Sequence, residues 1–185
     1  MAAMQAHARR VSYADLETWP DDGRRYELYD GEVFVVPSPL PVHQIAAARL
    51  HLLLHEYVHE HGGIVLFAPL DIVLTEYDVV QPDLLVFAPA RAHLLNPKKV
   101  TREPPDLAIE ILSPATARND RGRKMQLLAR HSVKEYWLFD PEVPRLEVYG
   151  LVDHGFEIAD AAESGDVAQS RLFPGLHVRP AELVI

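Results

Sequence analysis

Apolar and polar positions along the chain predict strands in the first third, followed by one long helix. Residues 26–30 and 32–36 are strand-like, and the Asp30-Gly31 pair between them is typical of a tight turn. Residues 41–61 are predicted to form a helix that Gly62-Gly63 closes. Apolar residues recur at helical spacing within it, namely Ile45, Leu50, Leu53, Leu54, Tyr57 and Val58.

The remainder of the chain continues with short apolar runs and a second helical segment. Strands are expected over residues 64–67, 71–74, 83–87, 107–112, 134–140 and 145–149. A helix is expected over 118–131, and short strands follow residue 156. Ser12 and Asp15 predict a short N-terminal helix that runs to Trp19.

This order of elements predicts the fold class. We expect an α/β (α+β) fold over residues 1–185, a single domain with one central mixed sheet flanked by helices. Its core should span about 26–149, with an N-terminal helix in 1–20 and a β extension in 150–185.

Composition limits the class of protein and its expected cellular location. The 185 residues are 48% hydrophobic and 24% charged, as in ordinary globular proteins. No apolar stretch approaches the ~20 residues that span a membrane, and residues 1–10 lack the apolar core of a signal peptide. There is no cysteine, so disulfides and thiolate sites are excluded. A cytoplasmic location is the expectation.

The net charge of −9 is unevenly distributed. Residues 98–134 contain nine basic and four acidic side chains, a local +5, which leaves −14 for the rest. Such a segment could form a basic surface that holds a polyanion, or it could be part of a mixed, solvated surface. Charge alone does not decide between these two interpretations.

Two carboxylates interrupt runs that otherwise read as buried strands. Glu110 is the one charge in residues 107–112, and Asp83 opens the run 83–87. A carboxylate is rarely buried without a partner, because its desolvation costs several kcal/mol. Two acids at the ends of neighbouring strands could bind Mg²⁺, which prefers oxygen ligands. The alternative is that Asp83 is a turn residue and Glu110 pairs with an arginine.

Lys124 follows the Glu110 strand in the second predicted helix. Asp120 is predicted as the N-cap of that helix, which would place Lys124 one turn from free backbone amides that suit a phosphate. A lysine there could orient the attacking water or stabilise charge on phosphorus. A solvated helix lysine is the alternative.

Several motifs together resemble a known family. They are Gln81-Pro82-Asp83, the run from Glu110 to Pro114, the run from Asp120 to Lys124, and the segments 25–32 and 135–141. Their order and spacing resemble the bacterial endonuclease branch of the PD-(D/E)XK restriction-endonuclease-like superfamily, from about Tyr26 to Tyr149.

The resemblance implies a role for each matching residue. Asp83 and Glu110 match the two metal-binding acids, and Glu27 matches an early acid that completes the metal site directly or through water. Leu112 stands where the superfamily usually has its lysine, so Lys124 is the matching candidate in the next helix. His43 matches a position without an assigned role. The resemblance further implies Mg²⁺ or Mn²⁺ as cofactor, DNA as substrate and a homodimer.

The sequence gives less support to a zinc site, a serine nucleophile or a nucleotide-binding loop. His43, His51, His55 and His59 drift around one helix face without a zinc-protease acid among them, which favours a solvated face. The chain has neither a G-x-S-x-G elbow nor a glycine-rich phosphate loop. Two further hypotheses stay open: a catalytically inactive nucleic-acid-binding or assembly protein with the nuclease fold, and a hydrolase of smaller phosphate esters.

Overall fold

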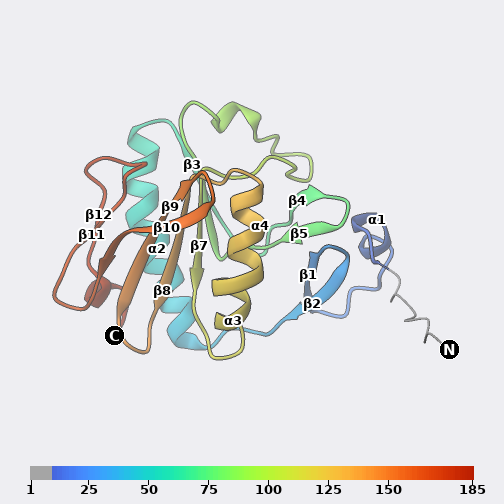
Figure 1. Cartoon of the computed structure of the whole chain (residues 1–185), viewed down its shortest axis with the longest axis horizontal. Coiled ribbons are helices and arrows are strands. Elements are labelled where there is room, and N and C mark those ends of the chain that lie inside the picture. The colour runs from blue at the N-terminus through green and yellow to red at the C-terminus, as the bar shows by residue number, and fades with distance from the viewer. Residues whose placement is uncertain (1–9) are drawn as a thin grey trace.

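A six-stranded mixed sheet forms the centre of the computed structural model, which describes residues 10–185 (Figure 1). Residues 1–9 lie outside the described residues. They include the start of the segment 1–20, where an N-terminal helix is predicted, and most of residues 1–10, where no signal-peptide core is expected. The strand order is β10-β9-β8-β7-β6-β3, and only β7 and β8 are parallel neighbours. The strands are β3 (Ile64–Phe67), β6 (Leu84–Phe87), β7 (Leu107–Ile111), β8 (Glu135–Asp140), β9 (Arg145–Val152) and β10 (Gly155–Ala162).

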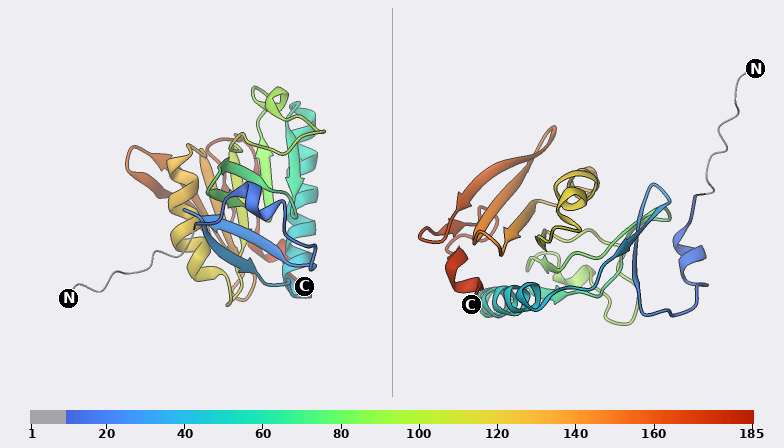
Figure 2. Two further views of the ribbon diagram at one scale, coloured as in Figure 1. Left: turned by 90° about the vertical axis from the view of Figure 1, so that its right-hand side faces the viewer. Right: turned by 90° about the horizontal axis from the view of Figure 1, so that it is seen from below.

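Helices cover both faces of this sheet, which explains the continuous apolar runs in its middle strands. Every residue of β6 and β7 is buried. Successive side chains of a strand point to opposite faces, so Leu84 packs in the cluster with α2 and Leu85 in the cluster with α4. Figure 2 shows α2 and α4 on opposite sides of the strands. The predicted mixed sheet flanked by helices is confirmed.

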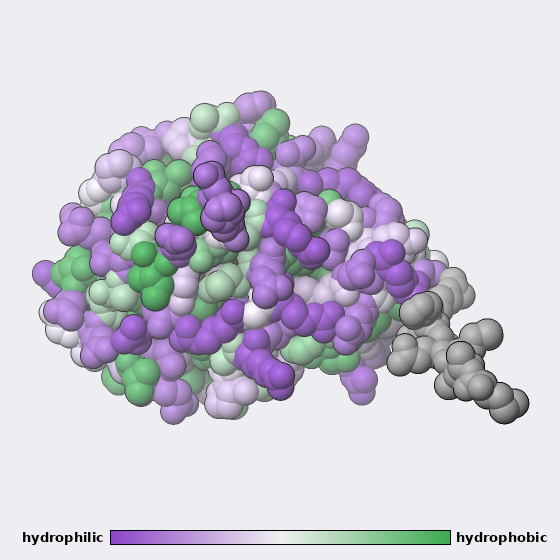
Figure 3. Space-filling model, in the orientation of Figure 1, coloured by the Kyte–Doolittle hydropathy of each residue, from purple (hydrophilic) through white to green (hydrophobic). Residues whose placement is uncertain are grey.

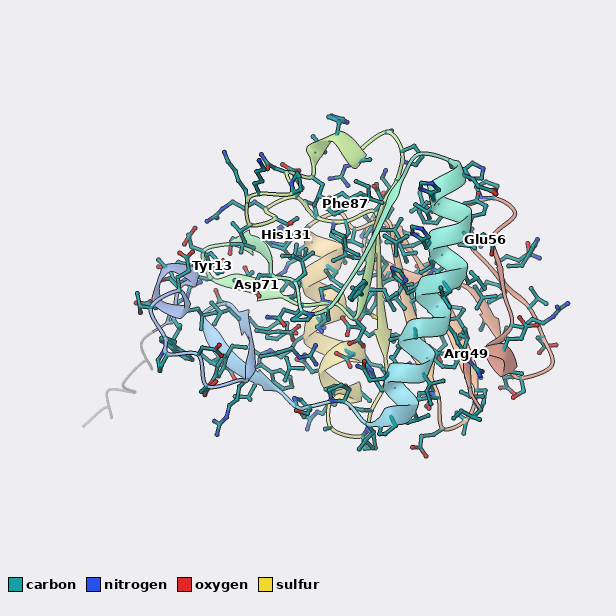
Figure 4. The ribbon with its side chains drawn as sticks, turned by 180° about the vertical axis from the view of Figure 1, so that it is seen from behind. Tyr13, Arg49, Glu56, Asp71, Phe87 and His131 are labelled. Carbon is teal, nitrogen blue, oxygen red and sulfur yellow. The ribbon has the colours of Figure 1, made fainter. Side chains whose placement is uncertain are left out.

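The long helix α2 (Pro41–Glu60) begins and ends close to its predicted limits. Its buried side chains recur every four residues and form the stripe that packs on the sheet: Ala46, Leu50, Leu54 and Val58. Gly62 follows in the left-handed region (φ +81°), where glycine is favoured. Arg49 projects from α2 toward the C-terminal segment (Figure 4) and donates to the carbonyls of Glu182, at 2.9 Å, and Val184.

The second helical segment differs from its prediction at its start. It consists of α3 (Ala117–Asn119), a π-helical turn (Asp120–Lys124) and α4 (Met125–Arg130). The residue that precedes its first turn is Thr116, so the prediction of Asp120 as N-cap is wrong. Asp120 is helical and 2% exposed. Lys124 therefore lies inside the helical segment, not beside free amides at its start.

A smaller antiparallel sheet, in the order β2-β1-β5-β4, stands at the N-terminal end of the molecule. Its members are β1 (Arg25–Tyr29), β2 (Glu32–Val36), β4 (Ile72–Thr75) and β5 (Asp78–Val80). Asp30 and Gly31 both have positive φ, 52° and 78°, as the predicted tight turn requires. The three-residue strand β5 was not predicted, because it is too short to show a periodic pattern.

The two ends of the chain depart modestly from expectation. Helix α1 (Tyr13–Leu16) has the predicted capping box of Ser12 and Asp15 but ends before Trp19. Toward the C-terminus, β10 is a full strand of the main sheet, followed by β11 (Ala168–Gln169) and β12 (His177–Val178). The face drawn in Figure 3 is mainly hydrophilic with scattered apolar side chains. Within residues 10–185, no helix has both the length and the apolar character to cross a membrane.

Candidate functional site

Three segments far apart in the sequence bring Glu27, Glu110 and Lys124 into direct contact. Lys124 Nζ lies 2.9 Å from Glu27 Oε1 and 2.9 Å from Glu110 Oε1. Glu27 belongs to β1, Glu110 to β7 and Lys124 to the π-helical turn. All three side chains are at most 5% exposed. The structure thus places one ammonium between two buried carboxylates.

Asp83 joins this group through the antiparallel pairing of β6 and β7. Leu84 faces Ile109 in the ladder, so Asp83, one residue earlier, lies opposite Glu110. Asp83 Oδ2 accepts hydrogen bonds from the backbone amide of Ile111 at 2.9 Å and pairs with His43 Nε2 at 2.9 Å. His43 enters from the first turn of α2, and its Nδ1 is buried without a partner among the described residues.

The π-helical turn adds a fourth carboxylate to the site. Asp120 Oδ1 lies 3.6 Å from Lys124 Nζ, four positions away on the same segment. A π-helical turn is wider than an α-helical turn and often marks a functional position. Here it places both ends of the turn, Asp120 and Lys124, in the buried interior. The hydroxyl of Tyr136 donates to the carbonyl of Asp120 at 3.1 Å and ties the turn to β8.

Glu27 is held from both of its oxygens. Oε1 accepts from the backbone amide of Gln81 at 2.8 Å, and Oε2 accepts from the Tyr29 hydroxyl at 2.6 Å. Asn119 donates to the same hydroxyl at 2.8 Å. Together with the contact to Lys124, these bonds give each oxygen of Glu27 a partner within the protein. Its position is therefore set by β1, the residue after β5, and α3.

Four carboxyl groups and one ammonium share the site, and burial acts on the pKa values of Glu110, Asp120 and Lys124. Burial raises the pKa of Glu110 well above its ordinary value; Lys124 opposes the increase, and Asp120, Asp83 and Glu27 add to it. Burial likewise raises the pKa of Asp120. Burial by itself lowers the pKa of Lys124, but Glu110 and Glu27 more than offset this, so its net pKa is raised and the ammonium stays protonated. One positive charge faces several carboxylates, which favours an additional cation.

A cavity of about 290 Å³ opens onto these groups, and we call it the carboxylate cavity. Glu27, Asp83, Glu110 and Asp120 all line it, together with His43 and Arg25. Asp83 Oδ1 and Glu110 Oε2 take part in none of the hydrogen bonds or ion pairs between residues 10 and 185. Each of these two acids therefore has an oxygen available to a ligand in the cavity.

The donor set fits Mg²⁺ or Mn²⁺ but not a closed protein cage. In the described part of the chain, no group of three or more His, Cys, Asp or Glu side chains is arranged to hold a metal ion. Mg²⁺ commonly takes only one or two carboxylates and keeps water or phosphate in its other positions. Asp83 and Glu110 could supply those two carboxylates from opposite strands.

The structure brings together all five residues singled out from the sequence and adds four more. Asp120 had been assigned to a cap, and Tyr29, Asn119 and Gln81 had not been considered. One signal was present, since Tyr29 lies two positions after Glu27 on a strand and so shares its face. Nothing in the sequence indicated Asn119 or the amide of Gln81, because their contacts depend on how distant segments pack.

The basic segment 98–134 does not form a continuous unpaired surface. Five of its nine basic residues are in ion pairs, namely Arg102, Arg121, Arg123, Lys124 and Lys134. Arg121 pairs with Glu147 at 2.5 Å, and Lys134 with the buried Asp106 at 2.7 Å. The mixed-surface interpretation of the charge pattern is therefore the better one.

Comparisons with known proteins agree with this architecture. A crystal structure titled "a putative nuclease belonging to DUF820", from Anabaena variabilis ATCC 29413, superposes with a TM-score of 0.77 at 20% sequence identity. The match covers 94% of this chain and 97% of that one, and at this identity it shows a shared fold. No functionally curated protein matches the chain. The model of the Uma2 family, described as "Putative restriction endonuclease", matches residues 13–182. The chain therefore belongs to the Uma2 family of restriction-endonuclease-like proteins.

Proposed function

We propose that this protein is a divalent-metal-dependent endonuclease that hydrolyses phosphodiester bonds in DNA. The observation that carries the proposal is the meeting of Asp83 and Glu110 at one cavity, each with an oxygen that has no partner among the described residues, while the buried Lys124 contacts Glu110. The family description and the similar nuclease structure support the same reaction class.

Asp83 and Glu110 are the proposed ligands of Mg²⁺ or Mn²⁺. When bound, the ion would polarise the scissile phosphate and activate a water molecule. His43 is a positioning residue in this scheme, because its Nε2 fixes Oδ2 of Asp83, which lines the cavity, and leaves Oδ1 without a partner among the described residues. The amide of Ile111 has the same effect on that carboxylate.

Lys124 would act on the phosphate side of the reaction. Its ammonium, held by Glu27 and Glu110, can orient the attacking water or stabilise the charge that develops on phosphorus. Glu27 already uses both oxygens within the protein, so we assign it to hold Lys124 and to contact the ion only through water. Asp120 contributes to the same positioning.

Plasmid cleavage by the purified protein tests the proposal. We expect nicking or linearisation with Mg²⁺ or Mn²⁺ and none with EDTA. Asp83→Asn and Glu110→Gln should each lose most of the activity, because metal and water are displaced together. Glu56→Gln is the matched control, since Glu56 lies on the exposed side of α2 (Figure 4). Full activity in Asp83→Asn or Glu110→Gln would refute the assignment. Salt-dependent DNA binding without cleavage under either metal would favour the inactive binding protein instead.

A further inference from the structure

A second cavity, of about 600 Å³, lies directly beside the carboxylate cavity, and we call it the apolar groove. It runs between one side of α2 and the connection that follows β3. Arg25, His43 and Asp83 line both cavities, so the two spaces meet at the proposed metal ligand. Its volume is in the range of pockets that hold small organic ligands.

The walls of the groove are apolar and partly aromatic. Phe67 is 59% exposed and Leu52 68% exposed, so both side chains are accessible to a ligand in the groove. The ring of His51 meets that of Phe67 edge to face at a centroid distance of 5.0 Å. Burial and the neighbouring His55 lower the pKa of His51, so its ring is uncharged at neutral pH. The groove thus offers flat, neutral surfaces to a ligand.

Arg25 supplies a cation where the two cavities meet. The residue is half-buried at the start of β1 and takes part in no ion pair between described residues. A protein with 27 acidic side chains has ample opportunity to pair an arginine. An arginine left available at a cavity is suited to bind a phosphate through its guanidinium. Asp83 is the one acidic side chain in the groove lining.

We propose that the apolar groove binds the base of an unpaired nucleotide next to the scissile phosphate, with Arg25 on an adjacent phosphate. This inference rests on the proposed function, because it takes the carboxylate cavity as the cleavage site. A base and its phosphate are joined by a single sugar, so a base in the groove keeps its phosphate near Asp83. Bases within a duplex are stacked and paired, and only an unpaired or flipped base can present its face to Phe67. The substrate class is therefore single-stranded or locally unpaired DNA.

Binding measurements in EDTA test the groove without reference to cleavage. The probe is a single-stranded oligonucleotide that carries 2-aminopurine, compared with the same sequence as a blunt duplex. We expect tighter binding of the single strand, with quenched 2-aminopurine fluorescence. Phe67→Ala should weaken its binding about 5- to 150-fold, as the loss of one stacked base predicts. Phe67→Trp should retain binding. Ile158→Ala is the matched control, because Ile158 is 58% exposed on β10, far from the groove lining.

Arg25→Gln tests the phosphate contact separately. It should weaken binding of the single strand and reduce the salt dependence by about one phosphate contact, without abolishing the fluorescence quenching. Equal affinity for duplex and single strand, with no effect of Phe67→Ala, would overturn the proposal. So would a homodimer that Phe67→Ala dissociates, because a second copy would then occupy the groove. If Phe67→Ala loses binding of the single strand, the groove proposal is supported even when no variant cleaves DNA. If the protein cleaves DNA and Phe67→Ala binds the single strand as wild type does, the groove proposal is wrong and the proposed nuclease function stands.

Discussion

Lys124 Nζ lies 2.9 Å from Glu110 Oε1 inside the protein, although the usual lysine position two residues after the second acid is occupied by Leu112. The ammonium reaches the acid from the helical segment that covers the sheet, not from the strand itself. Leu112 instead packs in the apolar cluster beneath α4. The π-helical turn thus supplies the positive charge beside Glu110, and the end of β7 at Leu112 remains apolar.

Replacing Lys124 should affect both activity and stability. Lys124→Met leaves Glu27 and Glu110 buried without their cation, a change that costs about 3–5 kcal/mol for a broken buried pair. DNA cleavage should fall about 100-fold or more. Urea unfolding and plasmid cleavage measure the two effects. Lys124→Arg keeps the charge and should remain folded with reduced activity, and Lys99→Met on an exposed loop is the control. Wild-type cleavage by Lys124→Met would remove Lys124 from the proposed mechanism.

Divalent metal should stabilise the folded protein by relieving the excess of negative charge at the site. At 100 times its dissociation constant, a ligand specific for the folded state adds about 2.7 kcal/mol. For a chain of this size that raises the melting temperature by roughly 5–10 °C. Thermal unfolding with Mg²⁺, Mn²⁺ and EDTA measures the shift. Glu110→Gln should lose the shift and Glu56→Gln should keep it; an equal shift in all three proteins would place the ion elsewhere.

The hydroxyl of Tyr29 should matter for turnover, although it lies behind Glu27. Tyr29→Phe removes the donor to Glu27 Oε2 and leaves Asn119 without that acceptor. We expect a stability loss of about 1–3 kcal/mol and a decrease in kcat of about tenfold with KM little changed, because the effect reaches substrate only through Lys124. Tyr26→Phe on the same strand is the control, since the hydroxyl of Tyr26 bonds to the exposed Asp22. Equal kinetics for the two variants would contradict a positioning role.

Asp106 should make the free energy of unfolding decrease at acid pH, through contacts that lie outside the candidate site. Burial raises its pKa, but Lys134, the amide of Ala88 and Arg91 more than offset this, so the net pKa is lowered. A lowered pKa means that the stabilisation is complete above the unfolded value of about 3.9 and is lost as the pH falls through the folded value. Asp106→Asn should cost about 1–3 kcal/mol at pH 7, because the hydrogen bonds to the buried carboxylate are lost while Lys134 remains half exposed.

Urea unfolding of wild type and Asp106→Asn between pH 7 and pH 2 follows this contribution. The difference between the two proteins should stay constant down to about pH 4 and shrink below it. Glu103→Gln is the control, because Glu103 also approaches Arg91 but is 49% exposed. A difference that grows toward acid pH would contradict the lowered pKa.

Local patterns predicted those elements whose signal is contained in their own residues. The hairpin of β1 and β2 depends on two turn residues that tolerate positive φ, and α2 depends on an apolar stripe repeated over 20 residues. Elements that depend on distant partners were missed or misplaced. The three residues of β5 form a strand through pairing with β4 and with the distant β1, where Leu28 faces Val79, and the helical segment around Asp120 begins at Ala117.

The acids were visible in the sequence because charge in an apolar strand is costly, so Asp83 and Glu110 had to have partners. The identity of those partners could not be read in the same way. Asp83 is held by His43 and by the amide of Ile111, and Glu110 by Lys124, through contacts between segments that are distant along the chain. The sequence predicted Glu27 as an acid that completes the metal site and Asp120 as a helix cap. Their shared contact with Lys124 Nζ could not be predicted, because it exists only after the two sheets and the helical segment pack together.

The sequence by itself determined most of the strands, the long helix and the presence of two strand-borne carboxylates, because these follow from local periodicity and from the cost of burying charge. The tertiary structure alone decided which groups meet: the ammonium between Glu27 and Glu110, the hydrogen bonds that commit Glu27, and the apolar groove that ends at Asp83. The physical reason is range. Periodicity acts over a few residues, whereas hydrogen bonds and ion pairs act over a few ångströms between segments that only the complete fold brings together.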